Sequence, residues 1–359
     1  MNPNNDNAYI NLGSIYKDLG NLDDALGSTL KSIELKPDNA DSHMNMGIIY
    51  QEIGNLDLAL SSTLKSIELK PDNADIQMNL AGIWMDKQCY QEAEKEVDKV
   101  LKSNYKSISK AHHLKAACLF AREKYVSAEK HLQKSIIERI GIDSSPCPPE
   151  VALRATRHAM EIKSSIPNHK HIDNLQDEIE KVAPIFLCRP VEDDLIKELY
   201  CIQANKLADT KTRDARYGNG LCTNFYLFRN KSPIIQELAI DLTKLATTAL
   251  DVDVYSLEYD SFFNIFKVGA GTGPHYHLNN ADKHFGLSEN KYTLVYYLDV
   301  GDQNCDNPGV LRLYDPDQNI LPNNGMIILM PASKTHSSYY EGTKDRLMIG
   351  VNFYAFKRN

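Results

Sequence analysis

The sequence predicts a chain of two folded parts, an all-α solenoid followed by a β-rich domain with flanking helices. The 359 residues are 42% hydrophobic and 25% charged, a globular composition with room for about two domains of roughly 150 residues. The first part repeats itself every 34 residues, and the last third alternates short apolar runs with Gly, Pro and Asn turns. We therefore expect a helical domain at 1–138, a linker with one helix at 139–185 and a β-rich domain at 186–359.

Two nearly identical segments carry the helical repeat. Residues 28–41 recur unchanged at 62–75, and small residues recur where two helices of a hairpin would meet, at Gly13, Gly47 and Ala81. Prolines stop one hairpin and start the next, at Pro3, Pro37 and Pro71. This pattern resembles the tetratricopeptide repeat, which implies a stack of helix-turn-helix hairpins.

The resemblance also implies a concave groove that docks a protein or peptide. Asn11, Asn45 and Asn79 recur with the period of the repeat and are the candidates for lining this groove. They form either a ladder that holds a peptide backbone or a polar face without a partner. The alternative is an array that only spaces or dimerises the chain.

Beyond the repeats, the pattern of apolar residues predicts helices at 150–165, 193–207 and 234–250 and a strand at 183–190. Short runs rich in Tyr, Phe, Val and Ile predict the strands that follow, at 254–267, 292–300, 310–314, 326–330 and 346–356. Helices followed by many short strands predict a double-stranded β-helix, or jelly roll, with the helices laid on one sheet.

Three histidines predict a metal centre in the β-rich domain. His275 and His277 follow the glycine-rich segment 269–274, which we expect to be a turn, and side chains two apart in an extended segment share a face. His336 follows the strand at 326–330 and is expected to complete a set of three ligands. Such a set leaves coordination positions open, as oxygen activation requires.

Ordered segments around these histidines resemble the 2-oxoglutarate and Fe(II)-dependent oxygenase superfamily over roughly residues 186–359. The segments are Phe-Lys-Val-Gly at 266–269, His-x-His at 275–277, Thr-Leu-Val-Tyr-Tyr-Leu at 293–298, Gly-Val-Leu-Arg-Leu-Tyr-Asp-Pro at 309–316, Asn-Asn-Gly-Met-Ile-Ile-Leu-Met-Pro at 323–331, and Thr335-His336 with Arg346. The chain is most similar to the branch that carries His-x-His where most relatives carry His-x-Asp or His-x-Glu. The resemblance implies a dioxygenase that uses Fe(II), 2-oxoglutarate and O2 to hydroxylate a substrate, with no catalytic residue beyond the metal ligands.

The resemblance implies that Arg346 pairs with the distal carboxylate of 2-oxoglutarate, an interaction worth about 1.5 to 3 kcal/mol. Gly350 and Asn352 share the face of Arg346 by alternation, which makes Asn352 a further co-substrate candidate and places the small Gly350 near the co-substrate. Tyr296 and Tyr297 lie on opposite faces of their strand, so we expect one of them to donate a hydroxyl to the co-substrate. Tyr297 is the candidate.

The ligand set leaves three alternatives. His277 takes the place of the carboxylate and gives an all-histidine centre, or Asp282 loops in as the carboxylate. In the third alternative the site is degenerate and empty, and the chain is a non-catalytic tetratricopeptide adaptor. A three-histidine, cupin-type dioxygenase that does not use 2-oxoglutarate is the alternative enzyme.

Charge and hydropathy exclude other classes of function. The net charge is -8 without a basic tract, so we expect no nucleic acid as a partner. No stretch approaches the ~20 apolar residues of a membrane helix, and the first residues lack the pattern of a signal peptide. The seven cysteines are scattered, without a Cys-x-x-Cys pair, which favours reduced thiols. We therefore expect a soluble cytoplasmic protein.

Overall fold

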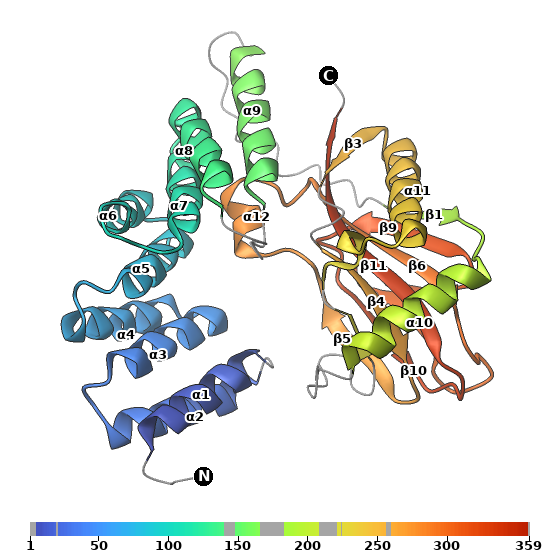
Figure 1. The fold of residues 1–359 in the computed structure, drawn as a ribbon, viewed down its shortest axis with the longest axis horizontal. Coiled ribbons are helices and arrows are strands. Elements are labelled where there is room, and N and C mark those ends of the chain that lie inside the picture. Colours follow the sequence, from blue (N-terminus) through green and yellow to red (C-terminus); the bar gives the residue numbers. More distant parts are fainter. Residues whose placement is uncertain are drawn as a thin grey trace. The chain divides into compact units, whose positions relative to one another are not determined.

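The computed structural model describes residues 5–18, 21–139, 148–165, 183–207, 221–223, 225–255 and 260–357. The chain divides into two compact units, Met1–Ser165 and Ile166–Asn359. The described residues of the first unit form helices, whereas those of the second form two sheets with helices beside them (Figure 1). This confirms the predicted order of an all-α part and a β-rich part.

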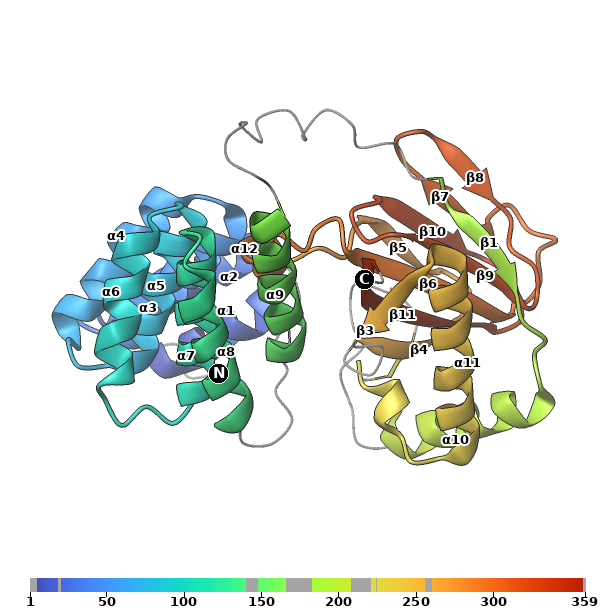
Figure 2. The ribbon, with the colours of Figure 1, turned by 90° about the horizontal axis from the view of Figure 1, so that it is seen from above.

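The first unit is built from helices that pack in consecutive pairs, α1 with α2, α3 with α4, α5 with α6 and α7 with α8 (Figure 2). The helix predicted at 150–165 forms as α9 and packs on α8, so it belongs with this unit rather than with a separate linker segment. The helices are α1 Asp6–Asp18, α2 Leu22–Leu35, α3 Ala40–Ile53, α4 Leu56–Leu69, α5 Ala74–Asp86, α6 Tyr90–Leu101, α7 Ile108–Ala121, α8 Tyr125–Ile137 and α9 Pro149–Ser165.

Asparagines cap the first helices of successive hairpins, one repeat period apart. The side chain of Asn39 accepts from the backbone N–H of Asp41 at the start of α3, and that of Asn73 accepts from the N–H groups of Asp75 and Ile76 at the start of α5. Each cap satisfies donors that a helix leaves unpaired, which is worth about 1 kcal/mol. The repeat in sequence is thus a repeat of helix boundaries.

Glycine permits close contact between the two helices of a hairpin. A Cβ built on Gly47 in α3 would collide with the Thr63 hydroxyl of α4 and approach the Ala59 carbonyl to 3.2 Å. Gly13 meets Thr29 in the preceding hairpin in the same way, and Ala81 is fully buried at the equivalent place in α5. The prediction that small residues mark the helix contacts is confirmed.

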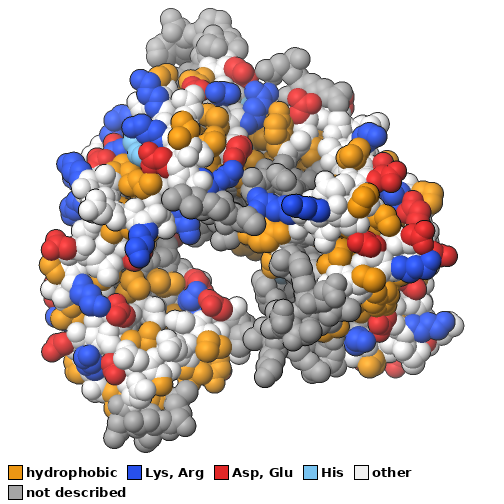
Figure 3. Space-filling view, in the orientation of Figure 1, with side chains coloured by type: hydrophobic (Ala, Val, Ile, Leu, Met, Phe, Trp, Pro, Cys, Tyr) orange, Lys and Arg blue, Asp and Glu red, His pale blue; other side chains and the backbone are white. Residues whose placement is uncertain are grey.

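Charged side chains of both signs are interspersed on the face of the molecule in Figure 3. The pairs Lys31–Glu34 and Lys65–Glu68 occupy equivalent places in successive repeats, and solvent screens exposed pairs of this kind, so each stabilises its helix only slightly. Within the described part of the chain, no helix combines the length and the apolar character that crossing a bilayer requires.

The second unit contains two sheets in which every pairing between the named strands is antiparallel. The larger has the strand order β1-β9-β6-β11-β4-β2, with β3 also paired to β11, and the smaller has the order β5-β10-β7-β8. The elements are β1 Ile185–Cys188, α10 Asp193–Leu207, β2 Leu221–Cys222, η2 Leu227–Arg229, α11 Pro233–Leu250, β3 Val252–Tyr255, β4 Ser261–Phe266, β5 Ala270–His275, α12 Asn280–His284, β6 Lys291–Asp299, β7 Pro308–Leu313, β8 Gln318–Ile320, β9 Met326–Pro331, β10 His336–Tyr340 and β11 Arg346–Lys357.

The larger sheet has an apolar core on each face, because successive side chains along its strands point to opposite faces. Along β11, Ile349 and Val351 pack with residues of α10 and α11, whereas Met348 packs with residues of the smaller sheet. In β6, Tyr296 belongs to the core beside the helices and Tyr297 to the core between the sheets. The side chains that the two sheets direct toward each other form what we call the inner face.

Two predictions about strands were wrong. The glycine-rich segment expected to be a turn forms β5, because glycine there allows close approach: a Cβ on Gly271 would lie 2.5 Å from the carbonyl oxygen of Ser338 in β10. The single strand expected at 254–267 is instead β3 and β4, with residues 256–259 outside the described residues.

The glycine contact between helices predicts a difference between two identical substitutions. Gly47→Leu forces a side chain against Thr63, so we expect the free energy of unfolding to fall by about 1 to 3 kcal/mol. Gly27→Leu in α2 is the matched control, because a Cβ there has nothing within 4 Å and leucine favours helix. Urea unfolding of the full chain measures both, and an equal effect at the two positions would contradict the packing argument.

Candidate metal centre

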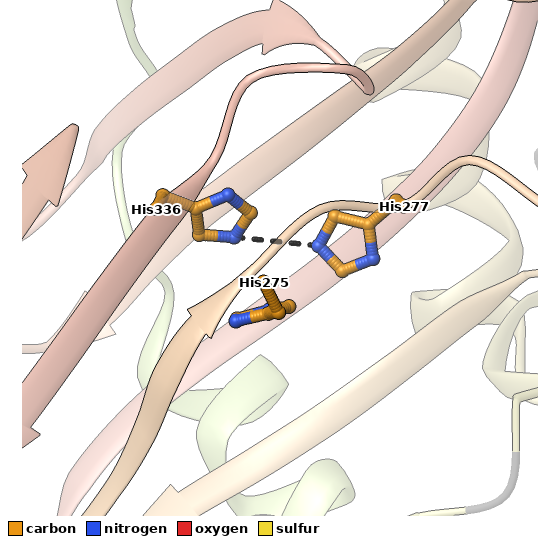
Figure 4. Close-up of side chains that lie close together, drawn as sticks. All are labelled: His275, His277 and His336. Carbon is orange, nitrogen blue, oxygen red and sulfur yellow. Dashed lines mark hydrogen bonds between the residues drawn. The ribbon is translucent and has the colours of Figure 1, made fainter. Parts of the chain in front are cut away.

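Neighbouring strands bring two of the predicted ligands together. β5 and β10 pair antiparallel, and their register sets His275, the last residue of β5, opposite His336, the first residue of β10. His277 lies two residues beyond β5, where its backbone N–H donates to the carbonyl oxygen of Ala332 at 2.8 Å. Backbone hydrogen bonds therefore hold all three histidines at one end of the smaller sheet (Figure 4).

The three imidazoles converge closely enough to share one ion. One ring nitrogen from each histidine lies within 4.8 Å of the other two, and this is the group of ligand side chains found among the described residues. The Nε2 atoms of His277 and His336 are 3.3 Å apart. Two nitrogens bound to one ion at about 2.1 Å lie roughly 3.0 to 3.4 Å apart, so this pair already has the spacing of two ligands.

Backbone carbonyls orient two of the three rings. The Nδ1 atom of His275 lies 2.8 Å from the carbonyl oxygen of Gly273, and Nδ1 of His336 lies 2.9 Å from that of Lys334. Because a carbonyl oxygen only accepts, each Nδ1 carries the proton and each Nε2 keeps its lone pair. Hydrogen bonds of this kind fix the tautomer and the ring plane of histidines that ligate metals.

Burial keeps the imidazoles of His277 and His336 neutral. It lowers the pKa of His277 well below its ordinary value, and the neighbouring His336 and His275 lower this pKa further. Burial also lowers the pKa of His336, to about 4, with a further contribution from His275. Neutral imidazole is the form that binds metal, so at neutral pH the site does not have to release protons from these rings to accept a cation.

Asp282, the alternative carboxylate ligand, does not join the cluster. Its carboxylate accepts hydrogen bonds from the Tyr354 hydroxyl at 2.6 Å, the Lys291 ammonium at 3.0 Å and the Asn279 backbone N–H at 2.8 Å. Asn279 and Asp282 form a capping box at the start of α12. Asp282 is fully buried and its carboxylate already accepts three hydrogen bonds, so its role in this structure is structural.

Arg346 lies on the inner face with most of its donors free. The side chain is fully buried, and Nη1 donates to the carbonyl oxygen of Pro308 at 3.0 Å. Nε and Nη2 have no hydrogen-bond partner among the described residues. The guanidinium carbon lies 5.0 Å from the ring centre of Tyr297. Because a buried unpartnered donor is costly, a guanidinium left this way indicates a site for an anion.

Two more buried polar side chains of the inner face were missed by the sequence analysis. The side-chain oxygens of Asn264 in β4 and Ser338 in β10 have no partner among the described residues. By alternation, Ser338 shares its face with His336 and Asn264 shares its face with Phe266. The sequence signal was available, because Asn264 interrupts an otherwise apolar strand and a buried polar residue there requires a partner.

The other two co-substrate candidates, Tyr297 and Asn352, do not lie together: one is beside Arg346 and the other beside His277. Tyr297 lies between the sheets beside Arg346, whereas the Tyr296 hydroxyl donates to the carbonyl oxygen of Pro190 at 2.8 Å on the opposite face. The structure places Asn352 against the histidines instead, with its Nδ2 atom 3.5 Å from Nδ1 of His277. Six residues of strand separate Asn352 from Arg346, or about 20 Å at 3.3 Å per residue.

Gly350, expected to leave room for the co-substrate, makes room for a side chain of the protein. A Cβ on Gly350 would collide with the ring of Phe262, which lies opposite it in β4. Phe262 also contacts the ring of Phe225 edge to face at 5.2 Å between centroids. The small residue at this position is thus explained by packing between neighbouring strands.

The three groove asparagines have different surroundings. Asn11 is exposed, Asn45 donates to the Ser14 hydroxyl of α1 at 3.0 Å, and Asn79 donates to the Thr63 hydroxyl at 3.4 Å. Asn45 thus joins the first helices of two successive hairpins. The three side chains share a place in the repeat but do not form a uniform ladder.

Family models match the helical unit, one described as TPR repeat over residues 13–54 and one described as tetratricopeptide repeat over residues 40–73. Residues 13–73 therefore contain tetratricopeptide repeats.

No curated protein matches the chain. Solved structures similar to the chain include Pseudomonas aeruginosa pilF, with 21% identity, a TM-score of 0.38 and coverage of 46% of this chain and 78% of that chain. MamA has 20% identity, a TM-score of 0.35 and coverage of 38% and 80%. The first TPR of Spaghetti (RPAP3), bound to an HSP90 peptide, has 21% identity, a TM-score of 0.31 and coverage of 34% and 93%.

Replacing the Asp282 carboxylate tests whether this side chain stabilises the fold or binds the metal. Asp282→Asn leaves Lys291 buried without its counter-charge, so we expect the free energy of unfolding to fall by about 3 to 5 kcal/mol. Adding Lys291→Met removes the orphaned charge and is expected to restore most of this loss. Urea unfolding measures the stabilities, and titration with Co(II) measures whether the double variant binds metal as the wild type does.

His336→Ala is the control for this titration, and we expect it to lose Co(II) binding because it removes one of the three converging imidazoles. A folded double variant that has also lost Co(II) binding would show that Asp282 is a ligand after all.

Proposed function

We propose that this chain is an Fe(II)- and 2-oxoglutarate-dependent oxygenase with a jelly-roll catalytic domain, joined to a tetratricopeptide array that docks a protein or peptide. One observation carries the proposal: three imidazoles converge within 4.8 Å, and the inner face that they adjoin also holds a buried guanidinium with two unpartnered donors. A keto acid with a second carboxylate matches both features, because one end chelates a metal and the other pairs with a guanidinium.

In this proposal His275, His277 and His336 hold the metal. Bound together, Fe(II) and 2-oxoglutarate supply O2-dependent decarboxylation of the keto acid and hydroxylation of a substrate. The three imidazoles are neutral ligands and the guanidinium is cationic, so the site attracts a dianion more strongly than a centre that includes a carboxylate. Arg346 binds and orients the distal carboxylate in an apolar surrounding, where a paired charge interacts more strongly than in water.

The side chains around Arg346 support this assignment. The Tyr297 ring lies against the guanidinium, and Gly309 leaves it room, since a Cβ on Gly309 would collide with Nη1. The unpartnered oxygens of Asn264 and Ser338 are further polar groups on the inner face for a polar ligand. Such groups are retained in a protein core when a ligand satisfies them.

The donor set itself favours a second candidate, a three-histidine dioxygenase that does not use 2-oxoglutarate. Among the described residues the cluster contains no carboxylate, and an all-histidine site does not require a keto acid. Nε and Nη2 of Arg346, which have no partner among the described residues, favour the keto acid, because a three-histidine enzyme without 2-oxoglutarate gives them none. A chain that binds no metal would leave the third candidate, a non-catalytic adaptor built on the helical repeats.

The tetratricopeptide repeats support the docking role of the first unit. Stacked hairpins of this kind present an extended surface for proteins or peptides. Asn11 is exposed on that repeat, so its side-chain amide is available to amide groups of a bound chain. We infer that the array selects a protein or peptide, which the second unit then hydroxylates.

Consumption of 2-oxoglutarate tests the enzyme directly. With Fe(II), O2 and ascorbate as reductant for the second oxygen atom, the purified chain is expected to release succinate and CO2 from 2-oxoglutarate even without its substrate. Arg346→Met is expected to raise KM for 2-oxoglutarate about 10- to 100-fold, because it removes charge-assisted hydrogen bonds worth about 1.5 to 3 kcal/mol. Succinate release against 2-oxoglutarate concentration measures this shift.

Arg312→Met is the matched control. Arg312 is exposed and paired with Asp317 at 2.9 Å, so replacing Arg312 is expected to leave KM for 2-oxoglutarate unchanged. Metal-dependent turnover of O2 that ignores added 2-oxoglutarate would favour the three-histidine enzyme, and turnover that survives both His336→Ala and Arg346→Met would reject the proposed site.

A further inference from the structure

His277 is held differently from the other two histidines. Nδ1 of His275 and Nδ1 of His336 each face a backbone carbonyl, whereas Nδ1 of His277 faces the side-chain amide of Asn352 at 3.5 Å. A carbonyl can serve only as an acceptor, but an amide side chain can present either its oxygen or its nitrogen. Which ring nitrogen of His277 carries the proton therefore depends on how the Asn352 amide is oriented.

Neighbouring groups fix the position of this amide. The Thr293 hydroxyl donates to Oδ1 of Asn352 at 2.7 Å, and Nδ2 of Asn352 donates to the Asp260 carboxylate at 2.9 Å. The backbone N–H of Asn352 also donates to the carbonyl oxygen of Asp260 at 2.8 Å. Asn352 is 4% exposed, and its side-chain amide is held by Thr293 and Asp260 next to the ring of His277.

The hydrogen bonds around His277 are consistent with one proton arrangement when no cation is bound. Nδ2 of Asn352 approaches Nδ1 of His277 as a donor, which leaves the ring proton on Nε2. That Nε2–H then donates to Nε2 of His336 across 3.3 Å. A proton thus lies between the two nitrogens that a cation would bind.

We propose that Asn352 is the positioning residue for His277 and that its amide turns over when the cluster binds a divalent cation, an inference that rests on the proposed metal function. The ring proton of His277 then moves from Nε2 to Nδ1, and Oδ1 of Asn352 accepts it. The tautomer shift neither releases nor takes up a proton at His277. Nε2 of His277 then carries a lone pair, as Nε2 of His275 and Nε2 of His336 already do.

The two groups that hold Asn352 accommodate the turned amide. The Thr293 hydroxyl can accept from Nδ2 as well as donate to Oδ1, because a hydroxyl does both. The turned oxygen needs a donor at Asp260, so its carboxyl takes up one proton from solvent as the amide turns, and burial raises the pKa of this carboxyl. The charged groups that act on Asp260 are Lys291, which favours the carboxylate, and Asp282, which favours the protonated form.

Metal affinity tests the proposal without relying on turnover. The full chain is titrated with Co(II) in competition with a chelating dye, and the visible spectrum of bound Co(II) reports its coordination. Asn352→Leu keeps the volume but removes the acceptor, so we expect affinity to fall about 10- to 100-fold, the usual effect of losing the partner of a ligating histidine. Asn319→Leu, on the exposed strand β8, is the matched control and should bind as the wild type does.

Conservative variants separate the acceptor role from packing. Asn352→Asp presents an oxygen to Nδ1 of His277, and Asp260→Asn always offers an N–H to the turned amide, so both should bind Co(II) within a few-fold of the wild type. Thermal unfolding checks that each variant is folded, and Asn352→Ala replaces the leucine variant if that one is not.

Wild-type affinity in the leucine or alanine variant would overturn the proposal, as would an aspartate variant that binds as weakly as they do. A wild-type chain that binds no Co(II) would instead overturn the proposed metal function itself, so the two failures are distinguishable.

Discussion

The antiparallel pairing of β5 with β10 is the constraint on which the candidate centre depends. Its register sets His275 opposite His336, and glycine at position 271 lets the two backbones approach without a side chain between them. A slip of one residue would turn one of these imidazoles to the other face of the sheet. The third imidazole is placed by a further contact, because His277 lies two residues beyond β5 and its backbone N–H donates to the carbonyl oxygen of Ala332, just after β9.

Buried charge explains why this arrangement favours a bound anion. Elsewhere in the same unit a buried charge has its partners: Asp282 is paired with Lys291 and bonded to Tyr354. Arg346 is equally buried, yet two of its donor atoms have no partner among the described residues. This difference between two buried charges of one unit is the basis for proposing that Arg346 binds an anionic ligand.

Part of the fold was readable in the sequence because it depends on local periodicity. The repeated segments 28–41 and 62–75 predicted the helical hairpins, and alternation along β11 predicted which residues share the face of Arg346. Long-range packing was not readable. β5 has a turn-like composition but pairs as a strand, because Gly271 is needed for close approach to β10.

Side-chain partners were equally hidden from the sequence. Asn352 shares the face of Arg346 but lies beside His277, and Asp282 lies near the histidines in sequence but bonds to Lys291 and Tyr354. The most direct test of the account is a crystal structure of the full chain, grown without oxygen with Fe(II) and 2-oxoglutarate, with anomalous diffraction recorded at the iron edge. The account predicts a single iron peak bonded by His275, His277 and His336, with a carboxylate of 2-oxoglutarate against Arg346. An iron peak elsewhere, or no peak at these imidazoles, would contradict it.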